Sequence, residues 1–232
     1  MARIHFIGGE KGGVGKSVVA RILAQYFIDR QLPFLGFDTD RSHGALLRFY
    51  GEFAAPAVID QFEGLDRIVE AAVEQPERRL IVDLAAQTYR LLTQWIDDSG
   101  LLELRAELGL AITYWHVMDA GRDSAELLVK LLDQYGERLP LVVVLNEVRG
   151  GDFGILESSG ALARAKAAGA AIVRLGRLQD ATMQKIDAHS TSFWAASNRA
   201  AGKDASSLGL LERQRVKTWL TRAYDDLARV DL

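Results

Sequence analysis

Cysteine is absent from this chain of 232 residues. Its absence excludes disulfide bonds, zinc held by thiolates, cysteine-ligated iron–sulfur clusters and cysteine nucleophiles. A reducing compartment, the cytoplasm, is therefore the expected location. Histidine is scarce, and the few that occur lack the H-x-x-x-H and H-E-x-x-H spacings of zinc sites, so a metal held by histidine is not expected. The histidines are His5, His43, His116 and His189.

Apolar runs long enough to span a membrane are also missing. At the N-terminus, MARIHFIGGEKGG, only about five residues of apolar run precede glycines and charges, too few for a signal-peptide core or a membrane span. We therefore expect a soluble chain. Strong positive charge is missing too: the chain has 28 lysines and arginines and 31 aspartates and glutamates, which gives a net charge of -3. This balance excludes the overall basicity of a dedicated nucleic-acid binder and leaves a local basic face open.

Short apolar runs alternate with amphipathic segments along the chain. The runs are nearly continuous in apolar residues, as in strands covered on both faces. They span residues 4–7, 34–37, 80–82, 110–118, 141–145 and 170–175. Helical periodicity marks residues 19–27, 65–73, 124–135, 161–168 and 210–230. The alternation predicts an α/β fold, a single-domain (1–232) doubly wound, mostly parallel sheet with helices on both faces and its ligand site at the carboxyl ends of the strands.

The stretch GGEKGGVGKS, residues 8–17, lies between the first predicted strand and the first predicted helix. This is the context of a loop that wraps a phosphate in backbone N–H groups at a helix N-terminus. Lys16 is expected to contact the β- and γ-phosphates, and the Ser17 hydroxyl to bind Mg²⁺. The strict pattern G-x-x-x-x-G-K-[ST] is broken because Glu10 occupies its first glycine position. The amides expected to cradle the phosphate belong to Gly12, Gly13, Val14, Gly15 and Lys16.

Residues 11–17, KGGVGKS, resemble the deviant Walker A motif K-G-G-x-x-K-[ST] of the ParA/MinD family of ATPases. The resemblance implies ATP and Mg²⁺ as ligands and a homodimer that forms on ATP binding. It also implies that Lys11 reaches across the dimer to the phosphates of the other subunit's ATP, where it stabilises charge during phosphoryl transfer. The alternative is a lysine that is merely solvated beside a glycine turn.

Two carboxylates end the second apolar run in GFDTDRS, at Asp38 and Asp40. On their own, two carboxylates at a strand end are often helix caps. The spacing from the phosphate loop favours a role at the nucleotide instead, and the pair resembles the D-x-D element of the family. The resemblance implies that Asp38 acts near Mg²⁺ and that Asp40, in switch I, orients the attacking water. Arg41 and Ser42 stand where partition ATPases have Pro-Gln.

Asp83 follows the apolar residues of RRLIVDLAAQ, a Walker B pattern whose carboxylate is expected to bind Mg²⁺ through water. Residues 84–87, LAAQ, replace the proline-containing switch II that is usual in the family. Gln87 is a further candidate for contacting water or the γ-phosphate. The alternative for Gln87 is a polar residue at a helix N-terminus.

Asn146 ends the apolar run LVVVLN. It resembles the residue with which relatives hydrogen-bond adenine. An amide suits this role because it offers both a donor and an acceptor. The alternative is an asparagine that caps a helix or forms a turn. The guanine signature N-K-x-D has no match, so ATP is preferred over GTP. The segment RLGRLQDATMQKID, residues 174–187, resembles the adenine-side loop of relatives.

The last predicted helix carries an apolar stripe that includes Val216, Trp219 and Leu220, and docking of this stripe onto the sheet is favoured over membrane binding. Basic residues near it are candidates for non-specific contacts with DNA phosphates. They are Arg199, Lys203, Arg213, Arg215, Lys217, Arg222 and Arg229. The polar segment 197–209 is expected to be a surface connector or, alternatively, a partner-binding loop.

These features favour an ATP-dependent dimerising switch that acts in plasmid or chromosome partition, cargo positioning or conjugative transfer, with a protein partner or cargo adaptor. One alternative is a metabolic enzyme of the same superfamily that uses ATP to activate or phosphorylate a small molecule. A third hypothesis is a nucleotide-binding scaffold with negligible hydrolysis, suggested by the altered sequence after Asp83.

Overall fold

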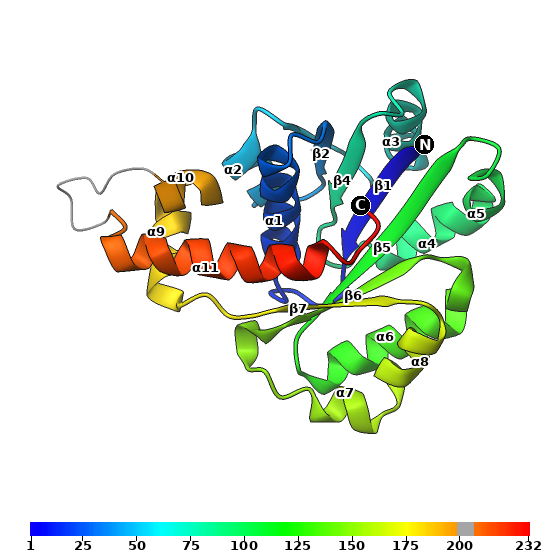
Figure 1. Cartoon of the computed structure of the whole chain (residues 1–232). Helices are drawn as coiled ribbons and strands as arrows, with labels where there is room; N and C mark the ends of the chain where they lie inside the picture. Colours follow the sequence, from blue (N-terminus) through cyan, green and yellow to red (C-terminus); the bar gives the residue numbers. More distant parts are fainter. Residues whose placement is uncertain (199–206) are drawn as a thin grey trace.

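A parallel β-sheet organises the chain, whose computed structural model describes residues 1–198 and 207–232 (Figure 1). Within these residues seven strands pair in the order β3-β2-β4-β1-β5-β6-β7. Every pairing between neighbours is parallel. The strands are β1 (Ala2–Gly8), β2 (Phe34–Asp38), β3 (Ala54–Pro56), β4 (Arg79–Asp83), β5 (Leu110–Met118), β6 (Leu141–Asn146) and β7 (Ala171–Leu175).

Helices cover both faces of the sheet, as Figure 1 shows, and each face has its own apolar cluster. One face carries α3 (Phe62–Glu74), α4 (Tyr89–Asp98), α5 (Leu101–Leu104), α6 (Arg122–Tyr135), α7 (Gly154–Ser158) and α8 (Ala161–Ala167). The other carries α1 (Lys16–Asp29), α2 (Ala45–Tyr50), α9 (Asp180–Ala188), α10 (Phe193–Asn198) and α11 (Leu210–Leu227). Two 3₁₀ helices, η1 (Gly136–Arg138) and η2 (Glu147–Arg149), complete the described elements.

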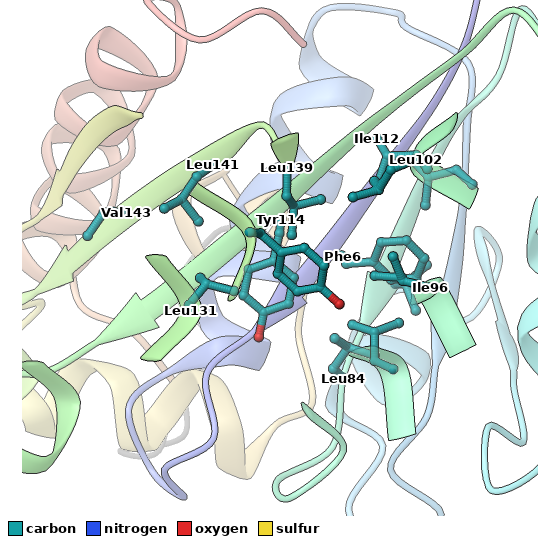
Figure 2. Packing of buried hydrophobic residues seen from close by; sticks show 14 of the residues in the cluster. Phe6, Leu84, Ile96, Leu102, Ile112, Tyr114, Leu131, Leu139, Leu141 and Val143 are labelled. Carbon is teal, nitrogen blue, oxygen red and sulfur yellow. The ribbon is translucent and has the colours of Figure 1, made fainter. Parts of the chain in front are cut away.

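The central strands are buried on both faces, which explains their continuous apolar sequences. All six residues of β6 are buried. Figure 2 shows the packing on the α3–α8 face, where Phe6 of β1 and Tyr114 of β5 lie among side chains from the covering helices, Ile96 of α4 and Leu131 of α6 among them. Burial of this kind is the main favourable contribution to the stability of such a fold.

The expected doubly wound fold is confirmed, and the six apolar runs are six of its strands. The edge strand β3 was not expected, because three residues ending in proline are too short to show a pattern. The short helices α2, α5, α7 and α10 were missed for a similar reason: helices of this length form through tertiary packing rather than through their own propensity. The longer helices α4 and α9 were missed as well.

The C-terminal helix α11 packs against α10, β7 and α1 through the expected stripe, with Val216, Trp219 and Leu220 buried. It ends at Leu227, earlier than the predicted Val230. Of the basic residues expected near it, Arg199 and Lys203 lie outside the described residues, as does most of the predicted connector 197–209. Throughout the described ranges, no helix combines the length and apolarity needed to cross a bilayer.

Parallel pairing brings the carboxyl ends of β1, β2, β4, β5 and β6 to one edge of the sheet. In the register, Asp83 of β4 lies between Asp38 of β2 and Ile7 of β1. Gly8 at the end of β1 pairs with His116 of β5 on the other side. The chain first winds from β1 toward β3 and later continues from β5 toward β7, so the order reverses beside β1, the usual place for a ligand.

Candidate functional site

The phosphate loop joins β1 to α1 through residues 9–15, and glycines make its path possible. Gly9 has a φ of 140°, and a Cβ there would lie 2.4 Å from the Val117 carbonyl oxygen. Gly15 precedes α1 with a φ of 95°, and a Cβ there would lie 2.2 Å from Asn146 Nδ2. Any larger residue at these positions would be strained or would clash. The first N–H groups of α1, beginning at Lys16, therefore point into a close-fitting loop.

Lys16 is buried inside this loop. Its Nζ donates to the Lys11 carbonyl oxygen at 3.2 Å, which uses one of three N–H donors. Burial lowers the pKa of Lys16, while the negative charges of Asp83, Glu10 and Asp40 act in the opposite direction. A buried ammonium group beside free helix amides is a binding site for an anion such as phosphate.

Asp83 supplies the negative counterpart at the end of β4. Both of its carboxylate oxygens are buried and make no hydrogen bond shorter than 3.5 Å among the described residues, although the Ser17 hydroxyl lies beside them. Burial raises the pKa of Asp83 to about 7, and the negative charge of Asp38 contributes to the rise. Ser17 and Lys16, which lie beside Asp83, act to lower the pKa. A buried carboxylate of this kind is stabilised by a nearby cation. The Asp83 carboxylate and the Ser17 hydroxyl provide oxygen ligands, which Mg²⁺ prefers. The residues present therefore fit the magnesium ion that is usual at P-loops.

Asp38 and Asp40 both hold the loop after β2. Asp38 accepts from the backbone N–H groups of Asp40 (3.1 Å) and of Leu47 in α2 (3.0 Å). Burial raises its pKa, and these backbone donors act against the rise. Asp40 accepts from the N–H groups of Ser42 (2.9 Å) and His43 (3.0 Å). Both residues therefore bind nearby backbone N–H groups, as the capping alternative predicts. Because a carboxylate can accept about four hydrogen bonds, each residue also has lone pairs that these bonds do not use.

Thr39, between these aspartates, is a site residue that the sequence analysis missed. Its hydroxyl donates to the Asp83 carbonyl oxygen (3.0 Å) and accepts from the Ala85 N–H (2.8 Å). Thr39 therefore ties the loop after β2 to the loop after β4. No local pattern distinguishes this threonine, since its partners lie more than forty residues away in the chain.

Lys11 lies beside a buried carboxylate of its own chain. Its Nζ is 3.4 Å from Oδ1 and 3.3 Å from Oδ2 of Asp119, and 3.8 Å from Asp123. Asp119 follows β5 and also binds Arg149 at 3.1 Å. Burial would raise the pKa of Asp119, yet hydrogen bonds, of which that from Ser124 is the strongest, hold it below its usual value. Asp119 and Arg149 are further residues that sequence reasoning missed.

Glu10, which breaks the strict loop pattern, has a structural partner. Its carboxylate accepts from the N–H of Tyr89 at 3.3 Å, the first residue of α4. A negative charge at this helix terminus is favourable. Gln87 lies just before α4, exposed and with a φ of 64°. The helix does not include Gln87, and Thr88 is its N-cap residue.

Asn146 connects the end of β6 to the phosphate loop. Its Nδ2 donates to the Val14 carbonyl oxygen at 2.7 Å, and its Oδ1 accepts from the Val148 N–H at 3.2 Å. The second bond caps η2, which corresponds to the capping alternative. The first holds the loop, so Asn146 lies beside the phosphate loop at the carboxyl edge of the sheet.

Comparison with known proteins places these residues in a family. The family described as CobQ/CobB/MinD/ParA nucleotide binding domain matches residues 5–174, a range that includes Lys11, Asp83 and Asn146. The chain is 31% identical to Protein MobD of Acidithiobacillus ferrooxidans over 155 residues, which are 65% of this chain and 64% of MobD. It is 28% identical to a Protein TraL of Escherichia coli over 160 residues, 65% of each chain. The matched part therefore spans less than two thirds of either relative.

A solved structure extends the likeness to the fold of the whole chain. It is described as a plasmid partition protein from Borrelia burgdorferi bound to AMPPNP. The TM-score is 0.51 at 11% identity, with 99% of both chains covered. At this identity the match shows a shared fold alone.

Proposed function

Since the chain belongs to the CobQ/CobB/MinD/ParA family of nucleotide-binding domains, we propose that it is a dimerising switch ATPase. ATP binding closes a homodimer, and slow, partner-stimulated hydrolysis to ADP and phosphate reopens it. Residues 1–232 act as one domain in this proposal. The ParA/MinD-type motif around Lys11 and the buried edge of the sheet support it.

The observation that carries the proposal is the buried carboxylate of Asp83 beside Ser17 and Lys16. Magnesium bound there would neutralise charge on the phosphates of ATP. Ser17 and Asp83, with Asp38 nearby, hold the metal directly or through water. Lys16 and the backbone N–H groups of Gly12, Gly13, Val14 and Gly15 bind the phosphates. In the proposal, Asp40 orients the attacking water and Asn146 contacts the adenine.

Lys11 makes the proposal specific for a dimer. Its side chain is 25% exposed and lies at the open edge of the site. We infer that in the ATP state it leaves its own carboxylates and contacts the phosphates of the facing subunit's ATP, where its charge favours phosphoryl transfer. Lys11 would then have no such role in a lone subunit.

The output of the switch is proposed to be plasmid or chromosome partition, cargo positioning or conjugative transfer in the cytoplasm. The family, whose description includes MinD and ParA, favours this class. A protein partner or cargo adaptor reads the dimer, and basic residues on or near α11 offer a surface for non-specific DNA. Membrane binding is less favoured because the apolar stripe of α11 is buried in the protein.

Oligomeric state tests the proposal. We expect the hydrolysis-blocked variant Asp40→Ala to form dimers with Mg-ATP and monomers with Mg-ADP, measured by light scattering after size exclusion. Lys16→Ala should remove nucleotide binding altogether, whereas Lys11→Ala should retain binding and lose dimerisation or hydrolysis. Monomers of Asp40→Ala at saturating Mg-ATP would refute the switch, and equal behaviour of the two lysine variants would refute their separate roles.

A further inference from the structure

Asp119 collects donors from three parts of the chain on one buried carboxylate. Only 1% of its side chain is exposed. It accepts from the Gly121 N–H (3.1 Å) and the Ser124 hydroxyl (2.6 Å), which fix its orientation at the end of β5. The remaining contacts are the two cations Lys11 and Arg149. Its position is therefore set by the sheet, while its charge is shared between two partly exposed side chains.

The two cations meet at the same oxygen of Asp119. Lys11 Nζ lies 3.3 Å and Arg149 Nη1 3.1 Å from Oδ2. Arg149 ends η2, and its side chain is 53% exposed. The Arg149 guanidinium also lies against the phosphate loop, because a Cβ built on Gly13 would be 3.1 Å from Nη2. Any movement of Lys11 toward a phosphate thus occurs within reach of Arg149.

We propose that Asp119 is a positioning residue that holds Lys11 within its own subunit, and that Arg149 makes its release easier. The proposal rests on the proposed function of Lys11 in the ATP dimer. Removing one cation from a buried carboxylate is costly when the charge is left uncompensated. With Arg149 in place, Asp119 retains a cation after Lys11 leaves. Asp123 also faces Lys11, but it is 78% exposed and its attraction is weakened by solvent.

The ATP concentration at half-maximal dimerisation measures this balance, in the Asp40→Ala background to prevent hydrolysis. Asp119→Asn frees Lys11 and should lower the midpoint, by about threefold if the contact is worth what a partly exposed ion pair usually is. Arg149→Gln leaves Lys11 as the sole cation on Asp119 and should raise the midpoint by a similar factor. Arg149→Lys keeps a charge and should restore most of the change. Arg164→Gln removes an exposed pair with Asp133 on α6 and is the matched control, expected to leave the midpoint in place.

Opposite shifts distinguish positioning from simple structural damage, which would weaken dimerisation in both variants. Shifts in the same direction, or none, would overturn the inference while a dimerising parent protein keeps the proposed function intact. A parent that stays monomeric with Mg-ATP would instead refute the proposed function. If Asp119→Asn fails to fold, the Arg149 pair decides: a raised midpoint for Gln with rescue by Lys supports the inference, and any other result overturns it.

Discussion

At the scale of single residues, Asp83 makes stability depend on pH. Its pKa rises from an ordinary 3.8 to about 7, chiefly through burial. The folded state therefore binds more protons than the unfolded state between these values, and stability falls as pH rises from about 4 to about 7. The buried His5 and His116, whose pKa values are lowered to about 3 and about 4, act in the opposite sense. A comparison of variants is needed to isolate Asp83.

We predict that Asp83→Asn removes this loss of stability. Without divalent cations, the variant should exceed the wild type by about 4 kcal/mol at pH 8 and by only about 1 kcal/mol at pH 4.5, because an amide has no charge to bury. Urea unfolding with EDTA at both pH values measures the difference. Adding Mg-ATP should stabilise the wild type more than the variant. If the free energies of unfolding of the two proteins change with pH in the same way, ionisation of Asp83 does not destabilise the fold and the prediction is wrong.

The residue scale also shows what local sequence can predict of the site. Lys16, Ser17 and Asp83 were expected from the spacing within short motifs that adjoin strands, and the structure brings them together. Thr39 lies at the unspecified middle position of the D-x-D element, and Asp119 belongs to no motif. The Asp119 carboxylate meets Lys11 across 108 positions of sequence, so only the strand order makes the pair visible. Asn146 was expected from its strand end, but its bond to Val14 was not.

At the scale of elements, Arg21 joins four helices of one face. Its side chain is 3% exposed, and it pairs with Asp187 of α9 at 2.9 Å. Its guanidinium lies 3.6 Å from the ring centroid of Phe49 in α2 and 4.6 Å from that of Phe193 in α10. Arg21 itself belongs to α1, the helix that begins at the phosphate loop. One cation thus fixes α2, α9 and α10 on the helix whose N-terminus faces the site.

Replacing Arg21 should loosen this face of the molecule. We expect Arg21→Ala to lower the free energy of unfolding by about 3 kcal/mol, because it leaves a cavity and removes both ring contacts and the ion pair. Arg30→Ala, at the solvent-exposed end of the same helix, serves as the control and should cost less than about 1 kcal/mol. Urea unfolding compares the two. Equal losses would mean that helix propensity, not the buried contacts, determines the effect.

Element boundaries followed the sequence where burial was complete. The run 110–118 coincides with β5, in which every side chain from Tyr114 onward is buried. In contrast, α4 was missed although its buried residues Leu92, Trp95 and Ile96 recur at the helical spacing. The six-residue helices α2 and α10 are too short to show such a repeat, and contacts distant in sequence determine their secondary structure.

At the scale of the whole molecule, the doubly wound topology separates two faces, and this separation makes the DNA hypothesis testable. The net charge is -3, so any attraction to DNA must come from a local surface rather than from the whole protein. Lys217 and Arg222 are exposed on α11, which lies on the α1 face. Lys130 is exposed on α6, on the opposite face of the sheet.

If the α11 face binds DNA, replacing Lys217 and Arg222 together by glutamine should weaken binding of the ATP-bound protein equally for duplexes of different sequence. Each lost phosphate contact should reduce the slope of log K against log salt by about 1, because fewer counterions are released. Fluorescence anisotropy with labelled duplexes at several salt concentrations measures both quantities. Lys130→Gln is the control and should alter neither. An equal loss for the control would assign the attraction to overall charge, and an unchanged double variant would exclude α11 as the DNA surface.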